Sequence, residues 1–324
     1  MLLVEFTING TLNRLSDIGY ALTNYWDAKI MRIDPIQYRI AKPYGGYVRL
    51  GYGSIEFSPN LFDSDWPPPV NGAVSVYYSA TTEEAKTLLF AGMAHLSGIT
   101  REAVKYDLYG PSYDETVADS TAYNADLDTV LSGILTGIAE IATVDTTYAR
   151  VSQPNVLHTT SGVHLAVDLA SDIAAFYTHC FYVVGSTAYL IDMLLDAGST
   201  TLTEYDFFPS TYDYLNPLSG ARSGAFSQFS SYPYGSELSV TQYHNSQANV
   251  EAALVNIMAV QHKPRTRLRL PMVAGSIVTP GEKLSWTDTA LGQDTAMWIR
   301  ARSIQYAFDN EEIIVDGEGA IAAG

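Results

Sequence analysis

Cysteine is nearly absent from this sequence. Cys180 is the single cysteine among 324 residues, so the chain can form no intrachain disulfide and no metal site built from several cysteines. It precedes the apolar run 181–184, which favours a buried free thiol. The six histidines are scattered, without the helical spacing and intervening glutamate of a zinc-protease site. We therefore predict neither a metal nor a cofactor.

Basic residues are also scarce. The chain has 18 Lys and Arg against 35 Asp and Glu, which gives a formal net charge of −17. Such a balance argues against a protein that grips nucleic acid, because that requires Lys and Arg to neutralise phosphates. Charged residues make up only 16% of the chain, below the roughly 25% that is usual for soluble domains. The hydrophobic fraction of 47% excludes intrinsic disorder.

Long apolar runs are missing as well. The most apolar window, 174–195, is interrupted by His179, Gly185 and Asp192, so no membrane-spanning segment is predicted. The first four residues are followed by Glu5 without a basic start, which does not match a targeting segment. We therefore expect a soluble protein that is made in the cytoplasm.

No catalytic motif is evident. Gly51 and Gly53 lack the third glycine of a dinucleotide loop, and no phosphate-binding Gly-x-x-x-x-Gly-Lys occurs. Residues 220–224 differ from a nucleophile elbow because the serine is one place off. Paired carboxylates of the glycosidase kind have candidates around an expected helix start, where acids also stabilise the helix dipole: Asp114, Glu115, Asp119, Asp126 and Asp128. The sequence does not predict an enzyme.

Three regions differ in their hydrophobic period. Residues 1–117 alternate with period two, which predicts short strands over 29–33, 46–51, 73–78, 88–94 and 103–109, with a turn at Asn71 and Gly72. Many short strands at this spacing indicate a β-barrel or sandwich.

Residues 118–202 show helical periods instead. Asp128 is a candidate cap for a helix whose apolar stripe runs from Val130 to Ile141. A second helix is predicted over 168–177, followed by a hairpin of 180–184 and 187–194 around a Gly185–Ser186 turn. This region is predicted to be a small α+β unit inserted in the β structure.

Residues 203–324 begin with a segment rich in tyrosine, serine and glycine. Tyr205, Tyr212 and Tyr232 lie in this segment, 203–240, whose lack of period indicates either a contact surface or a set of packed surface loops. A short helix is predicted over 247–257, and strands follow over 298–308 and 311–315 around an Asp309–Asn310 turn.

Arginines gather on two of the late strands. Alternation places Arg265, Arg267 and Arg269 on one strand face, and Arg300 and Arg302 on one side of another strand. Arginine forks of this kind suit a surface between subunits. The alternatives are a nucleic-acid contact, which the net charge disfavours, and a solvated face that balances nearby acids.

Three pairs of segments resemble a known family. They are FAGM (90–93) with KYDLY (105–109), DLASDI (168–173) with YLID (189–192), and WIRARSI (298–304) with VDGEG (315–319). In order and spacing they resemble the tail hub proteins of tailed bacteriophages and gene transfer agents. The resemblance implies a mostly β, α+β fold with two tube-type antiparallel β-barrels and an inserted helix–hairpin domain. The 203–240 segment has no place on that plan.

The resemblance also implies a role. A hub of this kind is a non-enzymatic homotrimeric ring at the end of the tail tube, in which three copies of two barrels adapt sixfold to threefold symmetry. Its partners would be itself, the distal tail or tube protein, and a tip or fibre protein, with DNA only in transit. The protein would be made in the host cytoplasm and end in the virion tail tip. The excess of acids would then keep DNA from sticking to the channel.

Two alternatives remain open from the sequence. One is the distal tail protein of the same machine, a sixfold ring. The other is a glycan-binding or carbohydrate-active β protein, which predicts an exposed groove lined by aromatic side chains such as Trp66 and Tyr232.

Overall fold

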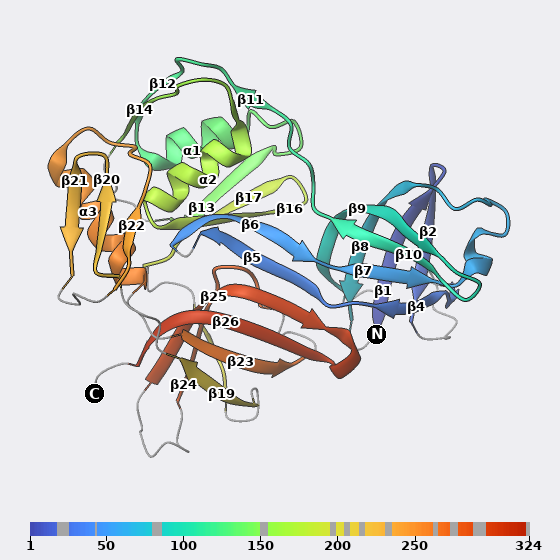
Figure 1. The fold of residues 1–324 in the computed structure, drawn as a ribbon. Helices are drawn as coiled ribbons and strands as arrows, with labels where there is room; N and C mark the ends of the chain where they lie inside the picture. The colour runs from blue at the N-terminus through green and yellow to red at the C-terminus, as the bar shows by residue number, and fades with distance from the viewer. Residues whose placement is uncertain are drawn as a thin grey trace.

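The chain folds into two strongly curled half-barrels of β-strands and an α+β unit that lies above them (Figure 1). The computed structural model describes residues 1–17, 26–42, 44–79, 86–149, 155–194, 199–203, 208–213, 218–230, 235–261, 265–272, 278–287 and 296–321. The predicted fold class, mostly β with a small helical unit, is confirmed.

The N-terminal half-barrel is one eight-stranded sheet. Its order is β3 (Trp26–Ala28), β2 (Thr11–Ser16), β1 (Leu2–Ile8), β8 (Asn71–Tyr78), β9 (Thr87–Ile99), β10 (Val104–Tyr109), β7 (Ser54–Phe57) and β4 (Ile30–Ile33). Burial alternates along β8, where Val74, Val76 and Tyr78 face inward, as period two predicts. Aromatic rings fill the interior, with Phe6 stacked on Phe57 at 5.3 Å between ring centroids.

The predicted turn at Asn71 and Gly72 is wrong. These residues are the first two of β8, and Gly72 lies against β1. A Cβ on Gly72 would lie 2.4 Å from the backbone oxygen of Thr7, so glycine is there to let two strands approach closely. A short 3₁₀ helix, η1 (Pro59–Phe62), lies between β7 and β8.

The second sheet joins all three parts of the molecule. Its order is β13 (Thr143–Tyr148), β17 (Thr187–Asp192), β16 (His179–Val184), β6 (Gly45–Tyr52), β5 (Ile36–Lys42), β25 (Ala296–Ala307), β26 (Glu312–Ile321), β23 (Arg265–Pro271) and β19 (Phe208–Asp213). β24 (Lys283–Thr287) pairs with β25 and also with β18 (Ser199–Thr201). η3 (Phe308–Asn310) forms the predicted hairpin turn between β25 and β26.

The β5–β6 hairpin connects the two half-barrels. The sequence places it among the N-terminal strands, but it leaves that sheet and lies between β16 and β25 (Figure 1). Lys42 forms an ion pair with Asp172 at 2.6 Å, and Arg49 forms one with Asp168, so the hairpin is also held to helix α2 (Ala166–Phe176). The predicted strand at 46–51 is confirmed as part of β6. The alternation of residues does not predict which strands β6 pairs with.

The α+β unit consists of helices packed against the β16–β17 hairpin. α1 (Leu127–Leu135) begins two residues earlier than an Asp128 cap would place it, because Asp126 accepts a hydrogen bond from the backbone N–H of Thr129 at 2.8 Å. The predicted second helix and the Gly185–Ser186 turn are confirmed. Two small strand pairs cover the helices: β11 (Thr116–Val117) with β15 (His164–Leu165), and β12 (Ala122–Ala125) with β14 (Val156–Thr159).

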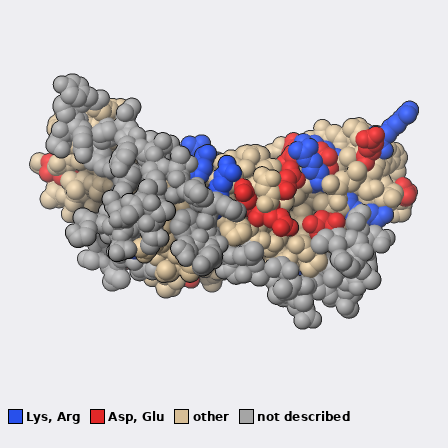
Figure 2. Space-filling view, turned by 90° about the horizontal axis from the view of Figure 1, so that it is seen from below, with Lys and Arg blue, Asp and Glu red and all other residues tan. Residues whose placement is uncertain are grey.

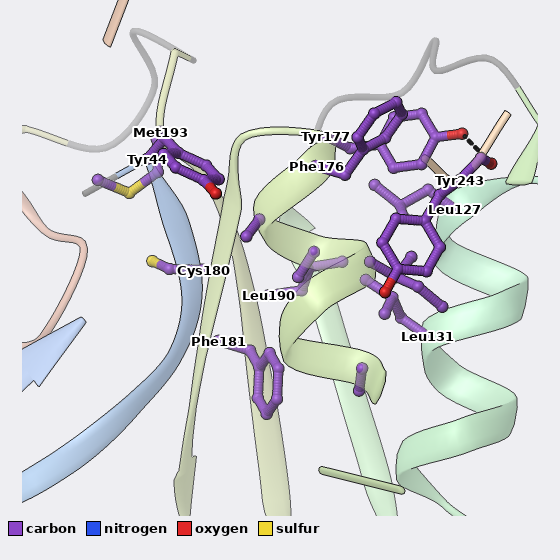
Figure 3. Packing of buried hydrophobic residues seen from close by; sticks show 14 of the residues in the cluster. Tyr44, Leu127, Leu131, Phe176, Tyr177, Cys180, Phe181, Leu190, Met193 and Tyr243 are labelled. Atoms are coloured by element: carbon purple, nitrogen blue, oxygen red, sulfur yellow. Dashed lines mark hydrogen bonds between the residues drawn. The ribbon is translucent and has the colours of Figure 1, made fainter. Parts of the chain in front are cut away.

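Part of the tyrosine-rich segment packs with this unit. β20 (Gly220–Ser223), β21 (Phe226–Phe229) and β22 (Glu237–Ser239) form a three-stranded sheet beside α3 (Gln247–Gln261), which contains the predicted 247–257 helix. Tyr243 lies beside Phe176 and Tyr177, and the Tyr177 hydroxyl donates to the backbone oxygen of Tyr243 at 3.3 Å (Figure 3). The described part of 218–261 therefore shares its core with the helices, and the predicted boundary at 202/203 stays a prediction.

Candidate functional site

The arginine face on β23 is exposed. Thr266, Leu268 and Leu270 are buried, whereas Arg267 and Arg269 on the other face are exposed. The alternation that predicts a shared arginine face is thus confirmed for these two residues. The backbone of Arg265 continues the same alternation, and its side chain lies outside the described part of the chain.

Acidic side chains on β26 partner these arginines. Arg267 makes a two-pronged contact with Asp316, Nε to Oδ1 at 2.7 Å and Nη2 to Oδ2 at 3.1 Å. Arg269 Nη1 lies 3.9 Å from Glu312 Oε2. Both arginine side chains remain 55% exposed. Exposed pairs of this kind contribute only about 0–1 kcal/mol to stability, so the face can exchange partners with a second molecule at little cost.

One of the predicted tyrosines lies on the strand that neighbours β23. β19 pairs with β23, and the backbone of Tyr212 is opposite Thr266. β19 is the last strand of the sheet order as far as the structure describes the chain, so the arginine strand lies one strand from the sheet edge. Tyr205 and Tyr232 lie outside the described residues. The structure therefore places Arg265, Arg267 and Arg269 at alternate positions of β23, whereas the register pairs Tyr212 with the buried Thr266 and so with the other face of the sheet. We call the exposed surface that carries Arg267 and Arg269, one strand in from β19, the β23–β19 face.

Arg300 and Arg302 do not belong to that face. Arg300 is only 3% exposed, and its Nη1 donates to the backbone oxygen of Gly281 at 3.0 Å. Arg302 is half-buried at a β-bulge between Ala301 and Ser303. The expectation that Arg300 faces a neighbouring subunit is wrong, because β25 is a central strand that is covered on both faces at this point. Alternation shows which side chains share a face and does not show what covers it.

The buried arginines lie near the single cysteine. Cys180 is fully buried, and burial raises the pKa of its thiol to about 12 despite the opposing effect of the Arg300 charge. At neutral pH the thiol is protonated and shielded from solvent. The predicted buried free thiol is confirmed.

Three of the five acids that could have formed a catalytic pair hold backbone amides instead. Glu115 accepts from the N–H of Ala139 at 3.0 Å, and Asp119 accepts from the N–H of Gly162 at 2.6 Å. Asp126 caps α1. Within the described ranges no group of three or more His, Cys, Asp or Glu side chains is placed to hold a metal ion. In those same ranges no helix is long and apolar enough to cross a membrane.

Charges of both signs share the underside of the molecule. Figure 2 shows Lys and Arg side chains beside Asp and Glu side chains on the middle and right of this face, with uncharged residues between them, and grey atoms over much of the left and lower right. The visible part is therefore not the uniformly acidic surface that a channel wall would present. Trp66 is 58% exposed, and Tyr232 lies outside the described residues, so the aromatic groove of the glycan-binding alternative stays a prediction.

Comparison with known proteins identifies the fold. No protein family and no curated protein matches the chain in sequence. Among solved structures, phage tail proteins match over nearly its whole length. A tail protein from Neisseria meningitidis has a TM-score of 0.58 at 9% identity, with 98% of this chain and 96% of that chain covered.

Two further solved structures of tail proteins match the fold of the chain over nearly its whole length. The 43 kDa tail protein of prophage MuSo2 from Shewanella oneidensis has a TM-score of 0.56 at 9% identity, with coverage of 98% and 96%. Prophage tail protein gp18 from Listeria monocytogenes has a TM-score of 0.52 at 11% identity, with coverage of 99% and 95%. The resemblance drawn from the three segment pairs is thus confirmed at the level of fold, and the chain has the fold of phage tail proteins.

Proposed function

We propose that the chain is a non-enzymatic structural protein of a phage tail, and that it forms a homotrimeric hub ring at the tail tip. The observation that carries this proposal is the presence of two curled half-barrels in one chain, held together by the β5–β6 hairpin. Three such chains place six half-barrels around a ring. A ring of this composition matches a sixfold tube on one side and a threefold tip on the other.

The β23–β19 face is the proposed contact between copies. It lies at a sheet edge, carries Arg267 and Arg269, and holds them in exposed ion pairs that a neighbour can replace. A chain with a net charge of −17 offers many carboxylates as partners. Arginine is suited to such contacts because its planar fork binds a carboxylate through two parallel hydrogen bonds.

The remaining parts of the role follow from the ring. The distal tail or tube protein would bind one side of it, and a tip or fibre protein the other. DNA would pass through the channel during ejection without being held, since carboxylates repel phosphates. The protein would be made in the host cytoplasm and reside in the virion tail tip.

The oligomeric state tests this proposal directly. We expect native mass spectrometry of the purified chain to show three times the 35.4 kDa monomer, and electron microscopy to show rings with threefold symmetry. A chain that remains monomeric at about 100 μM would refute the ring. A sixfold ring would favour the distal tail protein instead.

Charge reversal tests the contact. We expect Arg267→Glu combined with Arg269→Glu to weaken the trimer at least about tenfold in dissociation constant, because two attractive pairs become repulsive. Arg101→Glu is the matched control, since Arg101 is exposed in the β9–β10 turn of the other half-barrel. Circular dichroism of the isolated chains checks that both variants fold. If the control weakens the trimer as much as the double variant, the β23–β19 face is not the contact.

A further inference from the structure

A cavity of about 340 Å³ lies where the three parts of the molecule meet. Its wall combines β5 and β6 with β9 of the N-terminal half-barrel, β16 of the α+β unit and β25 of the second half-barrel. In Figure 1 these strands converge near the centre of the molecule. The volume is within the range of roughly 300–1,000 Å³ that is typical of small-molecule sites.

Tyrosine rings dominate the wall. Five tyrosines contribute, each from a different segment of the chain: Tyr38, Tyr47, Tyr113, Tyr182 and Tyr306. Two of their hydroxyls are held by backbone oxygens, Tyr38 by Leu89 and Tyr306 by Val278, both at 2.9 Å. Two of the five hydroxyls are thus already bonded within the chain, and all five tyrosines contribute to the lining. Leucine, valine and proline side chains complete an apolar lining.

The charge at this cavity is negative. Glu140 is the one charged residue among the described residues of the lining, and it is exposed. Burial, and to a smaller extent the nearby Tyr47 hydroxyl and the Glu140 carboxylate, raises the pKa of Tyr113 in the same wall. The described lining contains no lysine, arginine or histidine, so the lining itself offers an anion no opposite charge; the Arg49 guanidinium lies outside the lining, beside the Tyr47 ring.

We infer that the cavity binds a small organic cation with an apolar body, such as an aryl-substituted ammonium ion. Ring faces attract cations through their quadrupole, and the attraction is strongest where water is excluded. The chain shows this contact already, because the Arg49 Cζ lies 5.9 Å from the centroid of the Tyr47 ring. The apolar remainder of the wall would bury the body of the ligand, and Glu140 would neutralise its charge.

Occupancy would also tie the parts of the molecule together. Phe90 belongs to the N-terminal half-barrel, Tyr182 to the α+β unit and Tyr306 to the second half-barrel, and all three line the cavity. A ligand that contacts all of them stabilises their mutual arrangement, so it should raise the unfolding temperature. This inference does not depend on the proposed ring, because every contributing residue belongs to one chain.

Calorimetric titration of the full chain with three soluble probes tests the inference. We expect benzyltrimethylammonium to bind at least about tenfold more tightly than neutral benzyl alcohol or anionic phenylacetate, and to raise the unfolding temperature. Equal affinity for all three probes would overturn the inference, as would the absence of cation binding at about 10 mM.

Variants locate the binding. Tyr182→Leu keeps an apolar side chain and removes a ring, so it should weaken cation binding about 2- to 30-fold, whereas Tyr109→Leu on the outside of β10 should not. Glu140→Gln changes an exposed side chain without a folding risk, and it should weaken cation binding about 2- to 5-fold with little effect on benzyl alcohol. Glu102→Gln is its control. Unchanged cation affinity in both Tyr182→Leu and Glu140→Gln would place the binding elsewhere.

Discussion

Replacement of Gly45 by alanine should loosen the attachment of the α+β unit. Gly45 opens β6 with a φ of +149°, and β6 pairs in parallel with β16. A Cβ on this residue would lie 2.2 Å from the backbone oxygen of His179, well inside van der Waals contact. Alanine at positive φ costs about 1–2 kcal/mol, and displacing a packed neighbour costs a further 1–3 kcal/mol or so. We therefore expect Gly45→Ala to lower the free energy of unfolding by about 2–5 kcal/mol.

Gly10→Ala separates the two contributions. Gly10 also has a positive φ, +80°, but a Cβ there would meet nothing within 4 Å. This variant should therefore lose only about 1–2 kcal/mol. Urea unfolding followed by far-UV circular dichroism measures both variants. If Gly45→Ala loses no more stability than Gly10→Ala, the close approach of β6 to the His179 carbonyl is not a constraint and the reasoning fails.

Three further outcomes are expected. Asp126→Ala removes the cap of α1 and should cost about 1 kcal/mol in urea unfolding, whereas Asp128→Ala should not mimic it. Hydrogen bonding from Ser54 holds the pKa of Asp34 below its usual value, so the ionised carboxylate stabilises the folded state above about pH 4, and this stabilisation is lost as pH falls through the lowered pKa. In unfolding curves recorded across that pH range, the difference in free energy of unfolding between the wild type and Asp34→Asn should therefore shrink as pH falls. Cys180 should resist Ellman's reagent at pH 8 until urea unfolds the chain.

Local features of this fold could be predicted from the sequence. The alternation in 73–78 gives β8, the apolar stripe after residue 126 gives α1, and the Gly185–Ser186 turn gives the β16–β17 hairpin. Each of these rests on contacts between residues near one another in the chain. The same alternation places the arginines of β23 on one face, although it does not show whether that face is covered.

Long-range pairing could not be predicted in this way. The burial of Arg300 depends on segments distant in sequence, such as the one that contains Gly281, and its own neighbours in sequence carry no sign of them. The cavity could not be predicted for the same reason: Tyr38, Tyr113 and Tyr306 are far apart in the sequence and come together only in the folded sheets. The pairing of Gly72 with Ala94 of β9 likewise belongs to the assembled sheet, whereas the local Asn-Gly pair resembles a turn.

The β5–β6 hairpin has a consequence for biosynthesis. Its strand β5 pairs with β25, and the side chain of Gln37 donates to Ser303, 266 residues further along. During translation the hairpin leaves the ribosome long before its partner exists, so one edge of β5 stays unpaired until the last strands emerge. Folding that relies on such distant pairing is slow. The native surface of each chain is thus completed only near the end of synthesis, so a partner that needs this surface can bind only the whole chain.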